Sequence, residues 1–213
     1  MPNSHKENIM EDLIIIGAGV HAGEMAFMVE RINRISPTWN FLGHISKGEP
    51  SADSFAGSPV LGGFADLEQY PDARLVCDNS VSKEIELPEE RLVSLVDPSC
   101  FVHPTAQMGP GCVLYPNCFV GLNAVLGKRV FALSGAIINH DDHIEDNVIL
   151  CSNVSLAGYV YVEQDVYLGQ ASTVRQSLRI GKGSLIGMGS VVVKDIPPGT
   201  VMVGNPARKL RDK

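Results

Sequence analysis

The chain has 213 residues, of which 45% are hydrophobic and 19% charged, and its formal net charge is −7. This length suits one large domain or two small ones. The acidic balance and the lack of any long basic run exclude ordinary binding to a nucleic-acid backbone.

The N-terminus shows no targeting or membrane-spanning segment. Met1–Met10 is polar and lacks the apolar core of a signal peptide. No stretch reaches the run of about 20 apolar residues that a spanning helix needs. The five cysteines form no C-x-x-C pair, which favours free thiols in a reducing compartment over a disulfide framework or a zinc site. We therefore expect a cytoplasmic protein with no membrane span and no bound metal.

The first part of the chain has the pattern of a small β-α-β unit. Its expected elements, in chain order, are a strand at Leu13–Ile16, a helix from about Ala22 to Ile35, a strand at Phe41–Ile45, a short helix at Phe64–Tyr70, and strands at Leu75–Cys77 and Leu92–Val96. We predict an α/β, Rossmann-like small domain over residues 11–96, with a hinge at Asp97-Pro98.

A glycine-rich loop follows the first strand and opens the helix. Gly17, Gly19 and Ala22 have the spacing Gly-x-Gly-x-x-Ala. Backbone N–H groups in such a loop, together with the positive end of the helix, favour a phosphate. The spacing also fits a dinucleotide fingerprint, but the second strand ends near His44 and Ile45 with no acidic residue for a ribose. We favour a nucleotide-sugar phosphate as the ligand, and a tight turn with no ligand is the simpler alternative.

The second part of the chain is a repeat. From Val102 to Val192 an aliphatic residue returns at every sixth position, without an insertion. One hexad forms one flat face of a triangular coil, so three hexads make one turn. The aliphatic residue points inwards, and a glycine that often follows it, as at Gly121, relieves the turn. Stacked coils bury a continuous aliphatic column. The repeat predicts a parallel β-helix over residues 97–213.

One hexad carries a cluster of ionisable side chains. His140 can act as a general base near neutral pH, and the adjacent carboxylate of Asp141 can raise its basicity or fix its tautomer. One coil further on, Gly158 lies in the same column, where a missing side chain leaves room for a ligand arm. A polar surface loop that merely turns a corner is the simpler alternative. A metal site is disfavoured, because His140 and His143 are only three residues apart and His103 lies in a different column.

Together these features resemble the sugar O/N-acyltransferases of the hexapeptide-repeat transferases, whose β-helix is left-handed. That group contains sialic acid O-acetyltransferases and UDP-4-amino-sugar N-acetyltransferases. The resemblance extends from Leu13 to Leu210. It is strongest over Ile137–Asp141, Ser190–Thr200 and Gly204–Arg208.

The resemblance assigns roles to particular residues. It implies that His140 deprotonates the acceptor and that Asp141 supports its basicity. It implies a homotrimer that takes acetyl-CoA as cosubstrate between adjacent β-helices. The implied pantetheine path is lined by Gly158, Gln170 and Met188. The implied contacts with a nucleotide-linked amino sugar are Gly17, Gly19, Val20, His21, Asp78 and Asn79.

The chain also departs from the family pattern. Val20 stands where the loop of the family has a glycine, and Gly23 stands where a basic residue is usual. The usual Gly-Asn pair after the third strand is here Asp78-Asn79. Ile149 stands where a histidine is often found nine residues beyond the base. These changes affect the nucleotide and the acceptor sugar more than the base.

Three functions follow as hypotheses. The leading one is N-acetylation of a nucleotide-linked 4-amino sugar, in which His140 takes the proton of the amine and a backbone N–H stabilises the oxyanion. Acetylation of a sugar hydroxyl, of the sialic acid type, needs the same base and stays open. A non-catalytic β-helical binding or scaffold protein also stays open, and the altered loop at Val20 is its best support.

Overall fold

The computed structural model describes residues 10–79 and 86–213, so most of the polar segment Met1–Met10 lies outside the described residues. Contacts within the chain divide it into two units, Met1–Val93 and Ser94–Lys213. No helix in the described ranges is long and apolar enough to cross a membrane.

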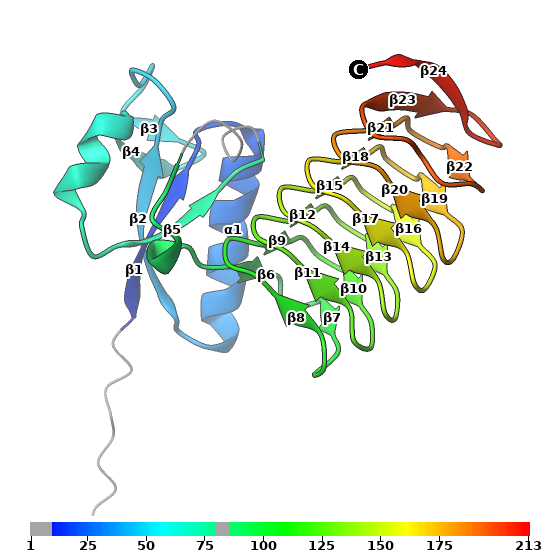
Figure 1. Cartoon of the computed structure of the whole chain (residues 1–213). Helices are drawn as coiled ribbons and strands as arrows, with labels where there is room; N and C mark the ends of the chain where they lie inside the picture. The colour runs from blue at the N-terminus through cyan, green and yellow to red at the C-terminus, as the bar shows by residue number, and fades with distance from the viewer. Residues whose placement is uncertain (1–9, 80–85) are drawn as a thin grey trace, which may run out of the picture. The chain divides into compact units, whose positions relative to one another are not determined.

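The first unit is a five-stranded sheet with one long helix (Figure 1). Its elements are β1 (Glu11–Ile16), α1 (Val20–Ile35), β2 (Trp39–Ile45), β3 (Ser54–Phe55), β4 (Ser58–Gly62), the 3-10 helix η1 (Phe64–Gln69), β5 (Arg74–Cys77) and the 3-10 turn η2 (Glu89–Arg91). The strand order is β3-β4-β2-β1-β5, and β1 pairs in parallel with both β2 and β5. The sequence therefore predicted the β-α-β core, while the Rossmann-like assignment stays a prediction.

The burial pattern explains this sheet. Leu13–Ile16 of β1 is fully buried, as expected of a central strand in a parallel sheet covered on both faces. On α1 the buried side chains include Met25, Met28 and Val29, which recur at helical spacing. The β3–β4 hairpin was not predicted, because its short strands carry serine and glycine rather than an alternating apolar pattern.

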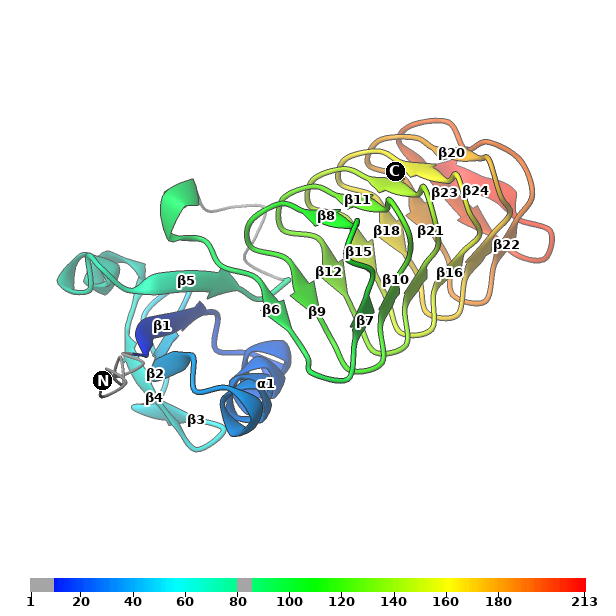
Figure 2. The same cartoon turned by 90° about the horizontal axis from the view of Figure 1, so that it is seen from below.

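The second unit is a left-handed parallel β-helix, as the sequence predicted (Figure 2). We name its three sheets the first, second and third face. The first face contains β7 (Phe101–Val102), β10 (Phe119–Val120), β13 (Ile137–Ile138), β16 (Ser155–Leu156), β19 (Thr173–Val174) and β22 (Val191–Val192). The second face contains β8 (Gln107–Met108), β11 (Val125–Leu126), β14 (His143–Ile144), β17 (Tyr161–Val162) and β20 (Arg179–Ile180). The third face contains β6 (Leu95–Val96), β9 (Val113–Leu114), β12 (Phe131–Ala132), β15 (Ile149–Leu150), β18 (Tyr167–Leu168), β21 (Leu185–Ile186), β23 (Thr200–Val203) and β24 (Arg208–Asp212).

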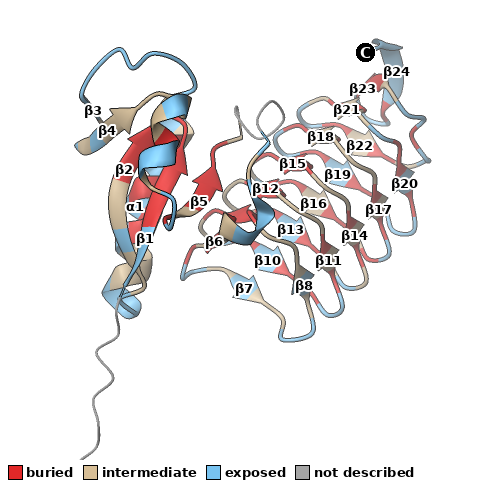
Figure 3. Cartoon of the chain, turned by 60° about the vertical axis from the view of Figure 1, so that its left-hand side comes forward, coloured by how far each residue is buried: buried red, intermediate tan, exposed pale blue. Residues whose placement is uncertain are grey.

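The repeat sets the register of these faces. Each two-residue strand pairs with the strand one coil later, so that Phe119 lies beside Ile137 and His143 beside Tyr161. The second residue of each strand points inwards, and every repeat aliphatic from Leu114 to Val192 is buried (Figure 3). This column of aliphatic side chains is the core of the β-helix.

The corners of the coils have a regular backbone. Every sixth residue from Gly111 to Gly189 has a positive φ, and most of these residues are Asn, Asp or Gly, which tolerate this conformation best. The glycines that follow the aliphatic residues have another role, contrary to the sequence-based interpretation. A Cβ on Gly121 would lie 2.8 Å from the backbone of Asn139. These glycines allow close approach between coils rather than relieving the turn.

Candidate active site

His140 lies on a corner of the β-helix. The turn Asn139–Asp142 joins β13 of the first face to β14 of the second face. Asp141 holds the positive-φ position of this corner, with φ 58°. Because the interior of the prism is filled with aliphatic side chains, the His140 ring lies outside it, with its side chain 51% exposed.

His140 and Asp141 form a hydrogen-bonded pair. The distance from His140 Nδ1 to Asp141 Oδ2 is 2.9 Å. The other carboxylate oxygen of Asp141 accepts a hydrogen bond from Asn123 Nδ2, one coil earlier, at 3.2 Å. The hydrogen bond from His140, and then that from Asn123, hold the pKa of Asp141 below its usual range. A carboxylate on Nδ1 keeps the proton there and leaves Nε2 as a base.

Gly158 lies directly against the His140 ring. A Cβ on Gly158 would be 2.5 Å from Cε1 and 2.6 Å from Nε2 of His140. The sequence predicted that the missing side chain would leave room for a ligand arm, but the imidazole itself fills much of that space. Gly158 therefore lets the ring approach the backbone of the next coil closely, and its contact with pantetheine stays a prediction.

Tyr159 borders the same ring. Its aromatic ring packs edge-on against the His140 imidazole, with centroids 5.1 Å apart and planes at 85°. Tyr159 has φ 61°, a conformation that bulky side chains rarely adopt. The Tyr159 N–H donates to the His140 carbonyl at 3.2 Å, which holds the two coils together at this corner.

Asp142 lies beneath this corner with only 1% of its surface exposed. Its Oδ2 accepts a hydrogen bond from the Asn139 N–H, and its Oδ1 accepts one from the Val160 N–H, both at 2.8 Å. Burial raises the pKa of Asp142 to about 7, although the two backbone N–H groups act in the opposite direction. Two carboxylates, the half-buried one of Asp141 and the buried one of Asp142, thus follow His140 in the chain.

Gln170 and Met188 lie on a different corner from His140. They are exposed and one coil apart, on the turns that lead from the third face to the first face. The Gly189 N–H donates to the Gln170 carbonyl at 2.8 Å, and Met188 is 81% exposed. The first face lies between these two residues and the His140 corner. The structure therefore places the predicted pantetheine residues along both edges of one face.

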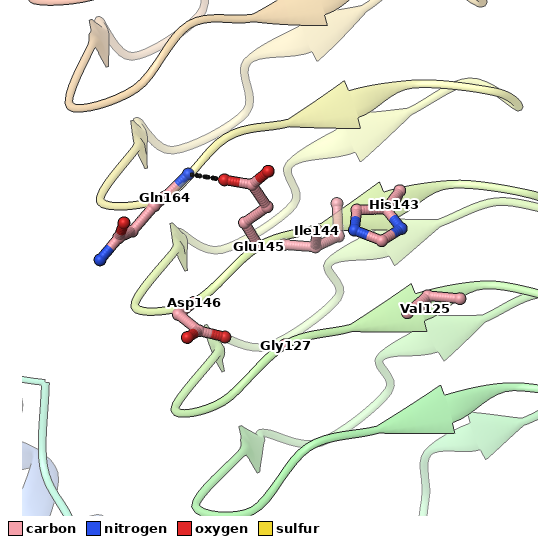
Figure 4. A pocket seen from close by; sticks show the side chains of 7 residues that line it. All are labelled: Val125, Gly127, His143, Ile144, Glu145, Asp146 and Gln164. Atoms are coloured by element: carbon pink, nitrogen blue, oxygen red, sulfur yellow. Dashed lines mark hydrogen bonds between the residues drawn. The ribbon is translucent and has the colours of Figure 1, made fainter.

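A pocket of about 270 Å³ lies on the second face, beyond the His140 corner (Figure 4). Its lining residues are Val125, Gly127, His143, Ile144, Glu145, Asp146 and Gln164. The Gln164 N–H donates to Glu145 Oε2 at 2.8 Å. The His143 ring stacks on Tyr161, with centroids 4.6 Å apart. His143 is thus part of a stacked column on the second face rather than a partner of His140.

A carboxylate from the end of β5, that of Asp78, lies against the glycine-rich loop of the first unit. A Cβ on Gly17 would lie 2.2 Å from Asp78 Oδ2, and one on Gly19 would lie 3.8 Å from the same oxygen. Asp78 is 2% exposed. The structure brings Gly17, Gly19 and Asp78 together, as expected for one site. However, the carboxylate lies where the sequence predicted a phosphate, and its charge opposes a second anion there.

The remaining loop residues lie at the start of α1 and after β5. Val20 is 74% exposed, and His21 Nδ1 lies 3.2 Å from Glu24 Oε2. Asn79 is half-buried. Behind the loop, the buried His44 ring packs edge-on against Phe41 and Phe55.

The burial of His44 favours the neutral form of its ring. Burial lowers the pKa of His44, while the Gly17 backbone and the Asp78 carboxylate act in the opposite direction. Neither ring nitrogen makes a hydrogen bond of ordinary geometry.

Sequence reasoning missed two residues of the His140 corner, Asp142 and Tyr159. A signal for Asp142 was present, because it occupies the hexad position where neighbouring coils have Ala124 and Val160. Tyr159 gave no such signal, since its positive φ and its contact with His140 emerge only in three dimensions. Among the residues that the structure describes, no group of three or more His, Cys, Asp or Glu is placed to hold a metal ion.

The geometry can be compared with known proteins. Residues 159–194 match the hexapeptide repeat of succinyl-transferase. An acyl-(acyl-carrier-protein)–UDP-N-acetylglucosamine O-acyltransferase from Synechocystis is 34% identical over 83 residues, or 39% of this chain. An enzyme of the same name from Burkholderia orbicola is 39% identical over 82 residues. The chain spans only 30% and 31% of the length of these two relatives.

Solved structures match nearly the whole chain. A GDP-perosamine N-acetyltransferase from Caulobacter crescentus, in complex with CoA and GDP-perosamine, is 24% identical with a TM-score of 0.83, over 96% of this chain and 99% of that one. The acetyltransferase domain of PglB from Neisseria gonorrhoeae is 25% identical with a TM-score of 0.75, over 94% of this chain and all of that one. WeeI from Acinetobacter baumannii is 25% identical with a TM-score of 0.78, over 95% and 100%. The repeat and the fold of this chain are thus similar to those of hexapeptide-repeat acyltransferases.

Proposed function

We propose that this protein transfers an acetyl group from acetyl-CoA to the amino group of a nucleotide-linked amino sugar, with His140 as the general base. The observation that carries the proposal is the His140–Asp141 pair on the surface of a hexapeptide coil, with the ring supported by Gly158. The C. crescentus structure with CoA and GDP-perosamine supports the same pair of substrates.

The chemistry needs few groups from the protein. The neutral amine attacks the thioester carbonyl carbon, and His140 Nε2 takes the proton that the nitrogen loses. The C–S bond then breaks, and the CoA thiolate recovers a proton from the imidazolium. Asp141 stabilises the imidazolium through its hydrogen bond to Nδ1. Since the thioester is already activated, most of the rate gain comes from holding the amine and the carbonyl in place.

The proposed acetyl-CoA path runs over the first face. Gly158 borders one edge of this face, and the exposed Gln170 and Met188 border the other. A complex of the PglB acetyltransferase domain with acetyl coenzyme A supports this donor. We propose that the pantetheine arm contacts these three residues, either within one copy of the chain or between two.

The proposed nucleotide contacts are in the first unit. Gly17, Gly19, Val20, His21, Asp78 and Asn79 surround the loop before α1. The Asp78 carboxylate beside Gly17 is suited to accept hydrogen bonds from ribose hydroxyl or base N–H groups. Because it opposes a phosphate on the loop itself, we propose that the loop holds the nucleoside part of the substrate.

We also propose that the protein acts as a homotrimer. The first face presents Phe101, Phe119 and Ile137, which are 53%, 36% and 39% exposed, to its outside. The Phe101 and Phe119 rings stack with centroids 5.1 Å apart. Such a contiguous apolar strip is typical of an interface between subunits.

The test of the proposed function is release of free CoA thiol from acetyl-CoA with a panel of acceptors. The panel contains UDP- and GDP-linked 4-amino sugars, the matching 4-hydroxy sugars, and free sugars including sialic acid. We expect turnover with one nucleotide-linked amino sugar. Turnover with hydroxyl acceptors alone would replace N-acetylation by O-acetylation. Failure to bind acetyl-CoA would overturn the enzyme proposal in favour of a scaffold.

A further inference from the structure

The hydrogen bonds at the His140 coil depart from those of the repeat. In neighbouring coils, the N–H that follows the first-face aliphatic donates to the coil above, from Gly121 to the Ile138 carbonyl at 2.9 Å and from Ala157 to the Val174 carbonyl at 3.0 Å. The corresponding N–H of Asn139 instead donates to Asp142 Oδ2 at 2.8 Å. The Leu156 carbonyl accepts from the side-chain amide of Asn139, at 2.6 Å.

The second bond of Asp142 crosses to the next coil. Its Oδ1 accepts from the Val160 N–H, whereas the matching Ala124 N–H donates to the Gly121 carbonyl within its own turn, at 3.3 Å. One buried carboxylate thus ties the two ends of the region that holds the His140 ring. Asn139 precedes His140, and Val160 follows the Gly158–Tyr159 pair against which the ring rests.

The fold itself does not require a carboxylate here. The column that contains Asp142 has Ala124 one coil before and Val160 one coil after, both fully buried and apolar. Burying an ionisable group costs free energy, and the raised pKa of Asp142 reflects this cost. A costly residue at a position where the repeat uses alanine or valine indicates a task other than packing.

We propose that Asp142 is a positioning residue for catalysis, which sets the spacing of the two coils so that the His140 ring lies on Gly158 with Nδ1 on Asp141. This proposal rests on the proposed function. In this role Asp142 does not contact either substrate and acts only through the backbone that carries His140. Asp141 then holds the ring from the solvent side, and Asp142 holds its backbone from below.

The test compares three variants in steady-state kinetics with acetyl-CoA. Asp142→Val installs the residue that the repeat carries at Val160, so the coil can return to its regular hydrogen bonds and remain folded. We expect its kcat to fall about 100-fold, as for a misplaced catalytic group, while the KM for acetyl-CoA stays within about twofold. Asp142→Asn keeps one acceptor oxygen for the two N–H groups, and we expect an intermediate kcat.

Asp146→Asn is the matched control. Asp146 Oδ1 also accepts a backbone hydrogen bond, from Lys128 at 2.7 Å, but on the corner after β14 and away from the His140 ring. We expect wild-type kcat for this variant. Wild-type kcat in Asp142→Val would overturn the proposal, and so would an equal loss in Asp146→Asn.

A spectroscopic measurement separates this proposal from the proposed function. The ¹⁵N and ¹H NMR signals of the His140 ring report the hydrogen bond between Nδ1 and Asp141 without any turnover. We expect this signature in the wild type and in Asp146→Asn, and its loss in Asp142→Val and partial loss in Asp142→Asn. If the wild type transfers no acetyl group, the proposed function fails while the ring signature still decides the role of Asp142. An unchanged signature in Asp142→Val, or in Asp142→Asn if the valine variant does not fold, overturns the positioning role.

Discussion

The residue that most tightly constrains His140 is Gly158. Its Cα faces the imidazole so closely that a single added carbon would overlap Cε1 and Nε2. The backbone of Gly158 has no positive φ, so alanine fits the main chain and only the ring must move. A substitution at Gly158 can therefore displace the His140 ring while leaving the main chain of the coil in place.

We predict that Gly158→Ala lowers kcat about 100-fold, because the ring is pushed from its place between Asp141 and the next coil. If Gly158 serves the ring, the KM for acetyl-CoA changes little. If it lines the pantetheine arm, that KM rises instead. Gly48→Ala is the control, since a Cβ there meets nothing within 4 Å. Full activity in Gly158→Ala would refute the ring geometry.

The raised pKa of Asp142 predicts that the stability of the protein depends on pH. Its pKa is raised from 3.8 to about 7, chiefly by burial. Between these two values the unfolded chain has released the proton that the folded chain still binds, so stability falls as pH rises through this window. The difference between these two pKa values corresponds to ~4 kcal/mol of folding stability, which the protein has at low pH and has fully lost above pH 7.

We therefore expect the unfolding free energy of Asp142→Val, relative to wild type, to rise by up to ~4 kcal/mol between pH 4 and pH 7. Urea unfolding at a series of pH values measures this difference, and groups common to both proteins cancel. The hydrogen bonds lost in the variant add an offset that does not depend on pH. A difference that stays flat across the window would contradict the raised pKa.

Within the β-helix, the structural feature that repeats most regularly is the corner between two strands. A residue with positive φ recurs at every sixth position from Gly111 to Gly189, and four of these residues are asparagines. A non-glycine residue in this conformation costs about 1–2 kcal/mol, and asparagine tolerates it better than a bulky side chain. Tyr159 violates this preference beside the His140 ring, which is typical of strain retained at a functional site.

We predict that Tyr159→Asn stabilises the protein by ~1 kcal/mol, because asparagine relieves the backbone strain of this corner. Little buried surface is lost in the exchange, since Tyr159 is 60% exposed. The reverse substitution Asn153→Tyr, at the preceding corner with φ 58°, should destabilise by a similar amount. Denaturant titration of the two variants and the wild type measures both changes in unfolding free energy. A loss of stability in Tyr159→Asn would mean that the contact with His140 outweighs the strain.

The sequence could predict the repeat but not the corners that carry the chemistry. Hexad spacing indicated the β-helix because the inward aliphatic residues, such as Ile138 and Leu156, directly mark its core. It also indicated His140 and Asp141. The 18-residue spacing also placed Gly158 one coil beyond His140. It could not indicate that the ring itself lies against Gly158, or that Asp142 accepts two backbone hydrogen bonds, because both depend on three-dimensional geometry. The closeness of Asp78 to Gly17 depends on pairing between β1 and β5, so only the family resemblance, and no local pattern, placed these residues in one site.

At the scale of the whole molecule, two units with different tasks follow each other along the chain. The β-helix has rigid, repeated pairing and the proposed acetyl-transfer groups. The first unit has a mostly parallel sheet, and Asp78, which follows β5, lies against Gly17 in the loop before α1. Because the net charge is −7, binding of the proposed anionic substrates would depend on local hydrogen-bond donors rather than on the overall electrostatic field.

The apolar strip on the first face predicts the assembly. We expect light scattering to give three times the 22.9 kDa mass of the chain. Phe119→Glu places a charge in this strip and should shift the protein towards the monomer. Phe27→Glu, at an exposed aromatic residue of α1, should leave the mass unchanged. A wild-type monomer would exclude the trimer.

The role of His140 as the general base is tested most directly by thiol release from acetyl-CoA, measured for wild type, His140→Ala and His143→Ala with one accepted amino sugar. Removal of a general base typically costs 100- to 10,000-fold in rate, so we expect kcat to fall by about that factor in His140→Ala. Binding of acetyl-CoA, measured by calorimetry, should stay unchanged. His143→Ala, whose ring stacks on Tyr161 instead, should keep near-normal kcat. Turnover by His140→Ala at the wild-type rate would contradict the account.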